Sequence, residues 1–376
     1  MSSATQERRL TLGAPVTVPW TSGGFVTAAQ RRERAASVVV DEPAQEALPR
    51  RAVPTWARRL LLGLAATATV ALVGASLMVG GYDISLQGLL TDPAQREMFL
   101  ISRVPRTLAL IFAAVAMSFS GVIMQMITQN KFVEPSTAGT SQWAGLGVLA
   151  TLIVVPGAPP MLKMLIATAF AFVGTMVFLG VLRRVAVRSS IIVPLVGIML
   201  GAVVGAITTF LAGNFDLLQS MSSWRSGGFS SVVRGFYEPL WAVVVIALLT
   251  WLLASRFTIA GLGKDVATSV GMRYEHVVIL GTAMVALSTG VTSVVVGFIP
   301  FLGLVVPNIV SMVMGDDMHK NLPWVAVLGV GLLMACDLVG RVVVAPMELP
   351  ASVILGAVGA VVFITLVVRQ RRHVSA

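Results

Sequence analysis

The chain has 376 residues, of which 56% are hydrophobic and only 12% charged, and its mean hydropathy is +0.88. Soluble domains carry about 25% charged residues, so this composition excludes a soluble globular protein and indicates a polytopic membrane protein. The net charge of +10 does not predict nucleic-acid binding, because Lys and Arg cluster in the tails and at the ends of apolar segments.

The residue inventory also limits the chemistry. The single cysteine, Cys336, excludes a disulfide framework and a Cys-based metal site. Three scattered histidines without an HExxH motif argue against a zinc enzyme. We therefore expect no cofactor and no metal site.

Residues 1–56 differ from the rest of the chain. They are rich in Arg, Ala, Ser, Glu and Pro, show no sustained period, and contain no apolar signal-peptide core. This composition predicts a disordered tail, followed by a transmembrane domain over residues 57–372.

Apolar segments of membrane-spanning length fill that domain, since a bilayer core takes about 20 apolar residues per helix. We predict an all-α fold with about ten transmembrane helices, at residues 58–80, 104–127, 141–156, 162–182, 191–213, 239–255, 277–296, 301–314, 323–340 and 350–368. The 301–314 segment is short and contains Pro307, which predicts a broken or tilted helix. Irregular backbone at that depth is tolerated only against protein or a water-filled cavity.

The basic residues set the expected orientation. With both termini in the cytoplasm, the inner side receives roughly twice as many Lys and Arg as the outer side, as the positive-inside rule requires. We therefore predict a multi-pass protein with both termini cytoplasmic.

Missing motifs narrow the function. Lys264 follows Gly263 but is itself followed by Asp265, so the chain has no phosphate-binding GxxxxGK[ST] loop and is not expected to hydrolyse ATP. The 104–127, 191–213 and 277–315 segments contain no carboxylate and no His, which ion-coupled carriers and intramembrane enzymes usually need. The exception, Asp337, is predicted to pair with Arg341 four residues later. A transporter of this composition needs its energy from a partner.

Two connections predicted on the inner side carry polar or amphipathic patterns. Residues 129–140 contain polar groups with Pro135 and Gly139, which predicts a structured loop. Residues 257–272 contain Val266 and Val270, which predicts a short amphipathic helix between Gly263 and Gly271 that lies on lipid or fits a groove on a soluble partner.

These segments together resemble the FecCD family, the permeases of bacterial ABC importers for ferric siderophores, haem and cobalamin. The motifs that carry the resemblance are Arg103-Val-Pro-Arg-Thr107, Ser120-Gly-Val-Ile-Met-Gln125, residues 130–139, Leu262 to Gly271, Gly297-Phe-Ile-Pro-Phe-Leu-Gly-Leu-Val-Val-Pro-Asn308 and Glu348 to Gly356. They cover residues 58–372 in order, and the tail lies outside them.

The resemblance implies a type II ABC importer permease fold in the bacterial cytoplasmic membrane. It implies a homodimer or heterodimer of permease subunits over two cytoplasmic ABC ATPases, loaded by an extracytoplasmic substrate-binding protein. The chain itself would not be an enzyme. The rival hypotheses are an ion-coupled secondary carrier and an intramembrane enzyme that acts on lipid.

The resemblance also implies roles for individual residues. Three arginines resemble those that dock glutamates of the binding protein: Arg103, Arg106 and Arg341. Four residues resemble the cytoplasmic gate: Asn130, Phe132, Ser189 and Ser190. Seven resemble the helix that couples to the ATPase: Gly261, Leu262, Gly263, Val266, Ser269, Val270 and Gly271.

The expected substrate is a ferric siderophore, with haem or cobalamin as the alternative within the family. One departure from the family pattern bears on this choice. Phe132-Val-Glu-Pro-Ser-Thr-Ala-Gly-Thr140 replaces the commoner Leu-Ala-Asp-Pro-x-Leu-Leu-Gly-Val, and Trp143 follows it. This variant is similar to permeases of catecholate-type siderophore systems.

Overall fold

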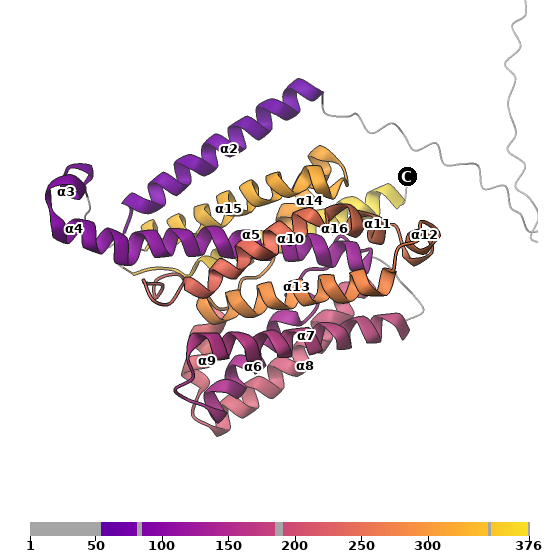
Figure 1. The fold of residues 1–376 in the computed structure, drawn as a ribbon, viewed down its shortest axis with the longest axis horizontal. Helices are drawn as coiled ribbons and strands as arrows, with labels where there is room; N and C mark the ends of the chain where they lie inside the picture. Colours follow the sequence, from indigo (N-terminus) through magenta and orange to yellow (C-terminus); the bar gives the residue numbers. More distant parts are fainter. Residues whose placement is uncertain (1–53, 81–84, 185–190, 345–346, 375–376) are drawn as a thin grey trace, which may run out of the picture. The chain divides into compact units, whose positions relative to one another are not determined.

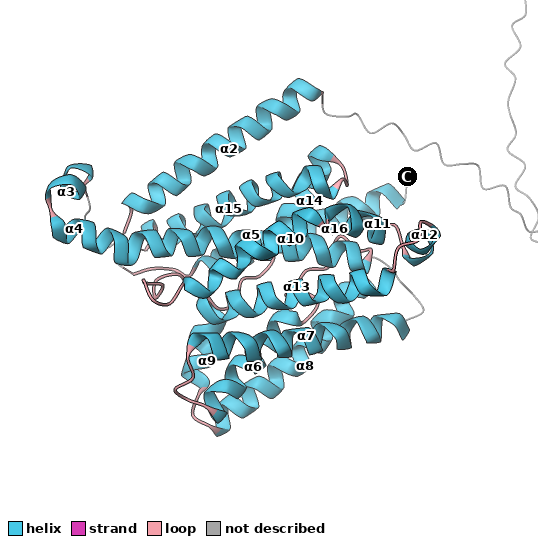
Figure 2. Cartoon of the chain, in the orientation of Figure 1, coloured by secondary structure: helices cyan, strands magenta, loops and turns pink. Residues whose placement is uncertain are grey.

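A computed structural model describes residues 54–80, 85–184, 191–344 and 347–374. The predicted tail therefore lies almost wholly outside the described residues, as do Ser189 and Ser190 of the predicted gate. Within these ranges the regular structure is helical throughout and contains no strand, which confirms the all-α class (Figure 2).

The helices follow one another along the chain with short connections (Figure 1). They are α2 (Thr55–Met78), α3 (Leu86–Thr91), α4 (Pro93–Met98), α5 (Val104–Thr128), α6 (Thr140–Val154), α7 (Pro160–Arg184), α8 (Ile192–Asn214), α9 (Leu218–Ser226), α10 (Ala242–Leu252), α11 (Ala254–Gly261), α12 (Lys264–Ser269), α13 (Tyr274–Val295), α14 (Leu302–Met314), α15 (Met318–Val342) and α16 (Ala351–Val374). A π-helical turn, Phe99–Arg103, joins α4 to α5, and a 3₁₀ turn, Glu238–Trp241, precedes α10.

A helix coincides with each predicted apolar segment, although fewer of them meet a strict criterion for crossing a membrane. Within the described ranges, six helices are long and apolar enough, and a seventh span results if the bent pair Glu238–Leu252 and Ala254–Gly261 counts as one. Three shorter apolar helices are Thr140–Val154, Leu302–Met314 and Ala351–Leu366. The chain is thus a multi-pass protein, and ten crossings remain a prediction. Helix α2 begins at Thr55, within the range predicted for the tail.

Helix α5 forms the centre of the helical unit. It packs against α13, α14, α15, α10 and α11, and its side chains are buried along nearly its whole length. Figure 1 shows it between α15 and α13. In contrast, few residues of α2 and α8 are buried: 6% and 22% of their apolar windows. In a membrane protein such outer faces meet lipid or another subunit rather than water.

Small residues allow the closest helix contact in this centre. A Cβ atom added to Gly121 of α5 would lie 1.9 Å from the carbonyl oxygen of Gly303 in α14. Glycines at helix crossings let two backbones approach in the absence of a strong hydrophobic driving force. Helix α14 starts after the irregular stretch that follows Val295, with Phe301 in the left-handed region (φ 61°), and it contains Pro307. The structure thus has one continuous short helix here with Pro307 inside it, so the helix itself is not broken; the irregular backbone lies before it, and a tilt remains a prediction.

Candidate functional site

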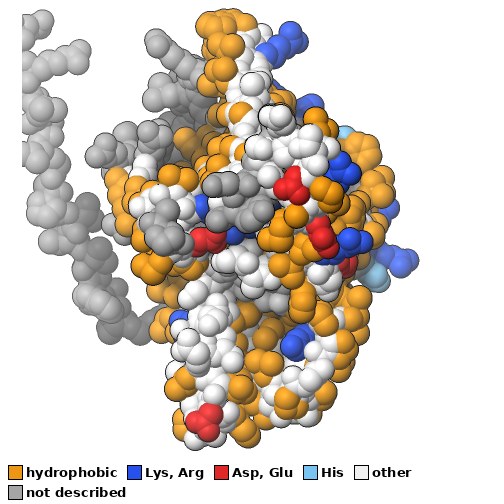
Figure 3. All heavy atoms as spheres, turned by 90° about the vertical axis from the view of Figure 1, so that its left-hand side faces the viewer, with side chains coloured by type: hydrophobic (Ala, Val, Ile, Leu, Met, Phe, Trp, Pro, Cys, Tyr) orange, Lys and Arg blue, Asp and Glu red, His pale blue; other side chains and the backbone are white. Residues whose placement is uncertain are grey.

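The three arginines predicted to dock the binding protein come together at one end of the helices. Arg106 donates to Asp337 at 2.9 Å and to Glu348 at 2.9 and 3.2 Å, and Arg341 also pairs with Asp337. The predicted Asp337–Arg341 pair is thus confirmed. All three guanidinium groups are buried, and Asp337 is only 3% exposed. We call these five residues, Arg103, Arg106, Arg341, Asp337 and Glu348, the outer ion network, after the side of the membrane predicted for them. Figure 3 faces this end of the helices, where charged side chains lie among hydrophobic ones.

The arginines of the outer ion network also close the end of α2. Arg103 donates to the carbonyl of Val79 at 2.8 Å, and Arg341 donates to the carbonyls of Ser76 and Val79 at 3.1 and 2.9 Å. The last carbonyls of a helix lack intrahelical donors and carry partial negative charge, so cations stabilise them. Arg103 and Arg341 are therefore engaged inside the protein. Glu348, whose side chain is 29% exposed, is the acidic member nearest to solvent.

At the opposite end, the 129–139 loop folds on its own side chains. Gln129 ends α5 in the left-handed conformation, and the Oδ1 atom of Asn130 accepts from the Phe132 amide at 2.9 Å. The Thr137 hydroxyl donates to the Phe132 carbonyl at 3.3 Å. The Phe132 ring is buried and packs edge-on against Phe363 of α16, with ring centroids 5.7 Å apart. The side chain of Asn130 therefore holds the backbone at Phe132, and their assignment to a gate remains a prediction.

Glu134 is the buried charge of this loop, and sequence reasoning gave it no role. Its two carboxylate oxygens accept from the amides of Phe301 at 2.9 Å and Gly303 at 3.1 Å, and Ser136 donates to the same group. Burial raises the pKa of Glu134 to about 7, while the three hydrogen bonds oppose that shift. Glu134 is the one acidic residue between Lys131 and Lys163. This lone acidic residue among apolar and small ones is the sequence feature that could have identified it as a functional candidate.

The predicted coupling segment, residues 261–272, contains the short helix expected from the sequence. Gly263 precedes α12 with φ 112°, and Gly271 follows it with φ 78°, values that favour glycine. Ala267 packs inward, whereas Leu262, Val266 and Val270 are 66%, 44% and 64% exposed. Ser269 faces solvent as well. An exposed apolar group of this kind outside the long spans marks a surface for a partner or for lipid.

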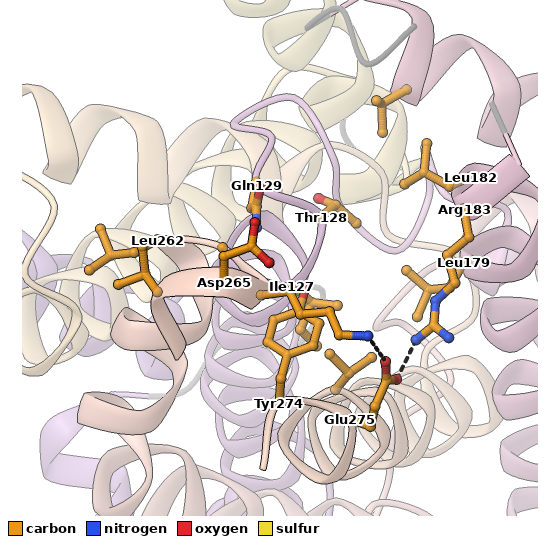
Figure 4. A pocket seen from close by; sticks show the side chains of 15 residues that line it. Ile127, Thr128, Gln129, Leu179, Leu182, Arg183, Leu262, Asp265, Tyr274 and Glu275 are labelled. Carbon is orange, nitrogen blue, oxygen red and sulfur yellow. Dashed lines mark hydrogen bonds and ion pairs between the residues drawn. The ribbon is translucent and has the colours of Figure 1, made fainter. Parts of the chain in front are cut away.

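A cavity of about 650 Å³ lies beside α12, between the ends of α5, α7 and α13. At its rim Glu275 of α13 accepts from Arg183 of α7 at 2.6 Å and from Lys264 of α12 at 3.2 Å (Figure 4). All three side chains are about half exposed, so these pairs orient the helix ends and contribute little stability. Glu275 was also absent from the residues predicted from the sequence.

The coupling segment touches the end of α5 directly. A Cβ atom on Gly261 would lie 2.7 Å from the sulfur of Met126, and one on Gly263 would lie 3.3 Å from Nε2 of Gln129. Gln129 leads straight into the 129–139 loop. The two segments assigned to coupling and gating are therefore in contact through one turn of α5.

The pKa of Glu134 predicts a pH dependence of stability. Because its folded pKa lies above its unfolded value, protonation favours the folded state; the contribution is complete below about pH 4.5 and is lost as pH rises through about 7. Between pH 5 and pH 8 the wild-type protein should lose about 2 kcal/mol relative to the Glu134→Gln variant. Thermal unfolding of both proteins in detergent at the two pH values measures this difference. Parallel pH curves would contradict the assignment.

The comparisons with known proteins agree with this architecture. Residues 68–369 match the FecCD transport family. The petrobactin import system permease protein FatD of Bacillus anthracis is 46% identical over 317 residues, which cover 84% of this chain and 93% of that protein. The ferric-anguibactin transport system permease protein FatD of Vibrio anguillarum is 38% identical over 299 residues, with 79% and 95% covered.

A solved structure of a metal-chelate type ABC transporter in an inward-facing conformation has the same fold. Its TM-score is 0.70 with 20% sequence identity, and the match covers 83% of this chain and 99% of the solved chain. The family match spans most of the chain, and it includes the outer ion network, the 129–139 loop and the coupling segment. The chain belongs to the FecCD transport family and is a permease subunit of an ABC importer, not an enzyme.

Proposed function

We propose that this chain forms the translocation path of an ATP-driven importer for a ferric siderophore. The observation that carries the proposal is the 46% identity over 93% of the length of a petrobactin import permease. The composition supports it, since the chain has no ATP-binding loop and its core spans lack the ionisable groups of an ion-coupled carrier. Hydrolysis by two ATPase partners would supply the free energy.

A transport assay tests the proposal and separates its rivals. Proteoliposomes that contain the permease, its ATPase and its binding protein should accumulate a ferric siderophore when ATP is present and should ignore a collapse of the proton gradient. Uptake that survives ATP depletion but stops with the proton gradient would establish a secondary carrier instead. Accumulation of haem or cobalamin, but of no ferric chelate, would assign the alternative substrate class.

The arrangement of the ends supports an orientation with both termini in the cytoplasm. Figure 1 places α11, α12 and the end of α16 at one end of the helices and α3 and α4 at the other. The end with α12 is then cytoplasmic and faces the ATPases, and the end with the outer ion network faces the binding protein. A second permease subunit would pack against the exposed apolar faces and complete the path.

The outer ion network suggests how a binding protein would dock. Arg103 and Arg341 are engaged with α2, so Arg106 is the arginine that an incoming carboxylate can reach, in competition with Glu348. Glutamates of the binding protein would then replace the charge of Glu348 beside Arg106. Replacement of one carboxylate by another would keep the Arg106 guanidinium paired, since a buried guanidinium without a carboxylate partner is strongly destabilising.

We therefore predict that Glu348→Gln strengthens docking. Removal of the competing charge leaves Arg106 with one carboxylate and should raise the affinity for the binding protein about tenfold, a change typical of one charge-assisted hydrogen bond. Binding to the permease in nanodiscs, measured at two salt concentrations, checks the change. The exposed Glu97→Gln in α4 serves as the matched control. An affinity that matches the control would mean that Arg106 does not receive the partner.

The coupling segment supports an ATPase contact through its exposed apolar side chains. Replacing Val266 and Val270 by Asp should leave membrane insertion intact, because both lie outside the spanning helices, and should separate the ATPase by placing charge in an apolar groove. Co-purification of the two subunits measures the effect. Leu90→Asp, at the exposed helix α3 of the opposite end, is the control and should retain the ATPase. If the double variant still co-purified with the ATPase, the segment would be a connecting loop without a role in binding the ATPase.

The gate assigned to Asn130, Phe132, Ser189 and Ser190 remains a proposal, supported by the buried ring of Phe132 in a fixed loop. A bulky chelate needs a wide path with weak contacts, since tight binding would prevent release. Phe132→Ala should therefore raise the ATP hydrolysed per chelate delivered. If Phe132 only packs against Phe363, the variant should lower stability and leave this ratio unchanged. Both quantities can be measured in the same proteoliposomes.

A further inference from the structure

We propose that Glu134 is a positioning residue that joins the 129–139 loop to α14, so that the two segments move as one body during transport. The proposal rests on the proposed transport function and concerns how the Phe132 ring is held. It follows from three sets of contacts between segments far apart in the sequence.

The first set lies at the start of α14. The two oxygens of Glu134 accept amide protons from Phe301, the residue that precedes this 13-residue helix, and from Gly303, its second residue. The first amides of a helix have no intrahelical acceptor, and the helix dipole favours a negative group there. A carboxylate from another segment thus does the work of a capping residue, and Phe301 itself, in the left-handed region, offers no capping side chain.

The second set lies further along α14. The side-chain amide of Asn308 donates to the Lys131 carbonyl at 2.7 Å, and the Lys131 ammonium group pairs with Asp316 just beyond the helix at 2.9 Å. The loop is therefore attached at the start, the middle and the end of α14. The Glu134 and Asn308 hydrogen bonds hold the loop against the start and the middle of α14, and the half-exposed Lys131–Asp316 pair adds little stability of its own.

The third set joins both segments to neighbouring helices. Phe301 packs so closely on α16 that a Cβ atom on Gly359 would lie 2.3 Å from it, and one turn later Phe363 meets the Phe132 ring. On the other side, Gln125 of α5 donates to the Gly303 carbonyl at 3.2 Å. Phe301 and Phe132 thus contact α16 one helical turn apart, so α16 links the start of α14 to the 129–139 loop.

Because Glu134 is buried, its hydrogen-bond partners are hard to replace. The side chain has no exposed surface, so no water is available to replace the amides of Phe301 and Gly303. A buried carboxylate without donors is strongly disfavoured, and so are helix amides without an acceptor. If the loop moved away from α14, the Glu134 carboxylate and the amides of Phe301 and Gly303 would all lose their hydrogen-bond partners. If the loop and α14 move together, these hydrogen bonds are kept.

Hydrogen exchange on the purified permease tests the joint body without any substrate or partner. In Glu134→Gln, which keeps the shape and removes the charge, amide exchange should rise about tenfold both in residues 298–304 and in residues 129–139. The Glu97→Gln control should change neither. Lys131→Gln, which removes the exposed ammonium contacts with Asp316 and Ser311, is a second variant and should change both segments in the same direction but less. Exchange that rises in one segment alone, or in neither, would overturn the proposal.

The second readout separates positioning from a purely structural role. In assembled complexes, the ATP hydrolysed per chelate delivered should rise several-fold in Glu134→Gln, and Glu134→Asp, which keeps the charge, should restore most of the coupling. An unaltered ratio despite faster exchange would overturn the positioning role. If the wild-type complex moves no chelate, the proposed function fails, whereas the exchange experiment still decides whether the loop and α14 form one body.

Discussion

The structure depends on one constraint: a polar group placed among apolar helices must find its partner within the protein. No water at membrane depth can replace a missing hydrogen bond, and an unpaired charge there is costly. The chain meets this constraint with two buried carboxylates. Asp337 pairs with both Arg106 and Arg341 at one end of the helices, and Glu134 accepts two backbone amides at the start of α14 toward the other. Both carboxylates join segments that are distant in the sequence.

Asp337 and Glu134 are stabilised by different kinds of partner. Asp337 lies between cations, and the outer ion network ties the ends of α2, α5 and α15 with Glu348 at its solvent side. Among the described residues Glu134 pairs with no cation; Ser136 and two backbone amides stabilise its charge, while burial raises its pKa. Paired opposite charges fix the ends of helices relative to one another. A carboxylate that accepts backbone amides instead attaches a loop to the start of a helix.

The sequence predicted the helices well because their signal is local. Apolar length, Pro307 and the glycines around α12 each act within a few residues, and the structure places helices where these patterns indicated. The Asp337–Arg341 pair was likewise predictable from its spacing on one helix. Pairings across the fold were not: Glu134 with Phe301, and Arg106 with Glu348, depend on how α5, α14 and α16 pack. The burial of Arg103 against the end of α2 could likewise not be predicted from the spacing of residues in the sequence.

The packing of α5 brings the coupling segment and the 129–139 loop into contact. Gly261 and Gly263 have no side chain, so the backbone of the coupling segment lies against Met126 and Gln129 at the last turn of α5. Close contact between backbone and side chain transmits displacement with little slack, since packed interiors have low compressibility. The coupling segment therefore contacts the last turn of α5, which continues into the 129–139 loop, and that loop is in turn hydrogen-bonded to α14. The same small residues that allow the helices to approach therefore also determine which segments can move together.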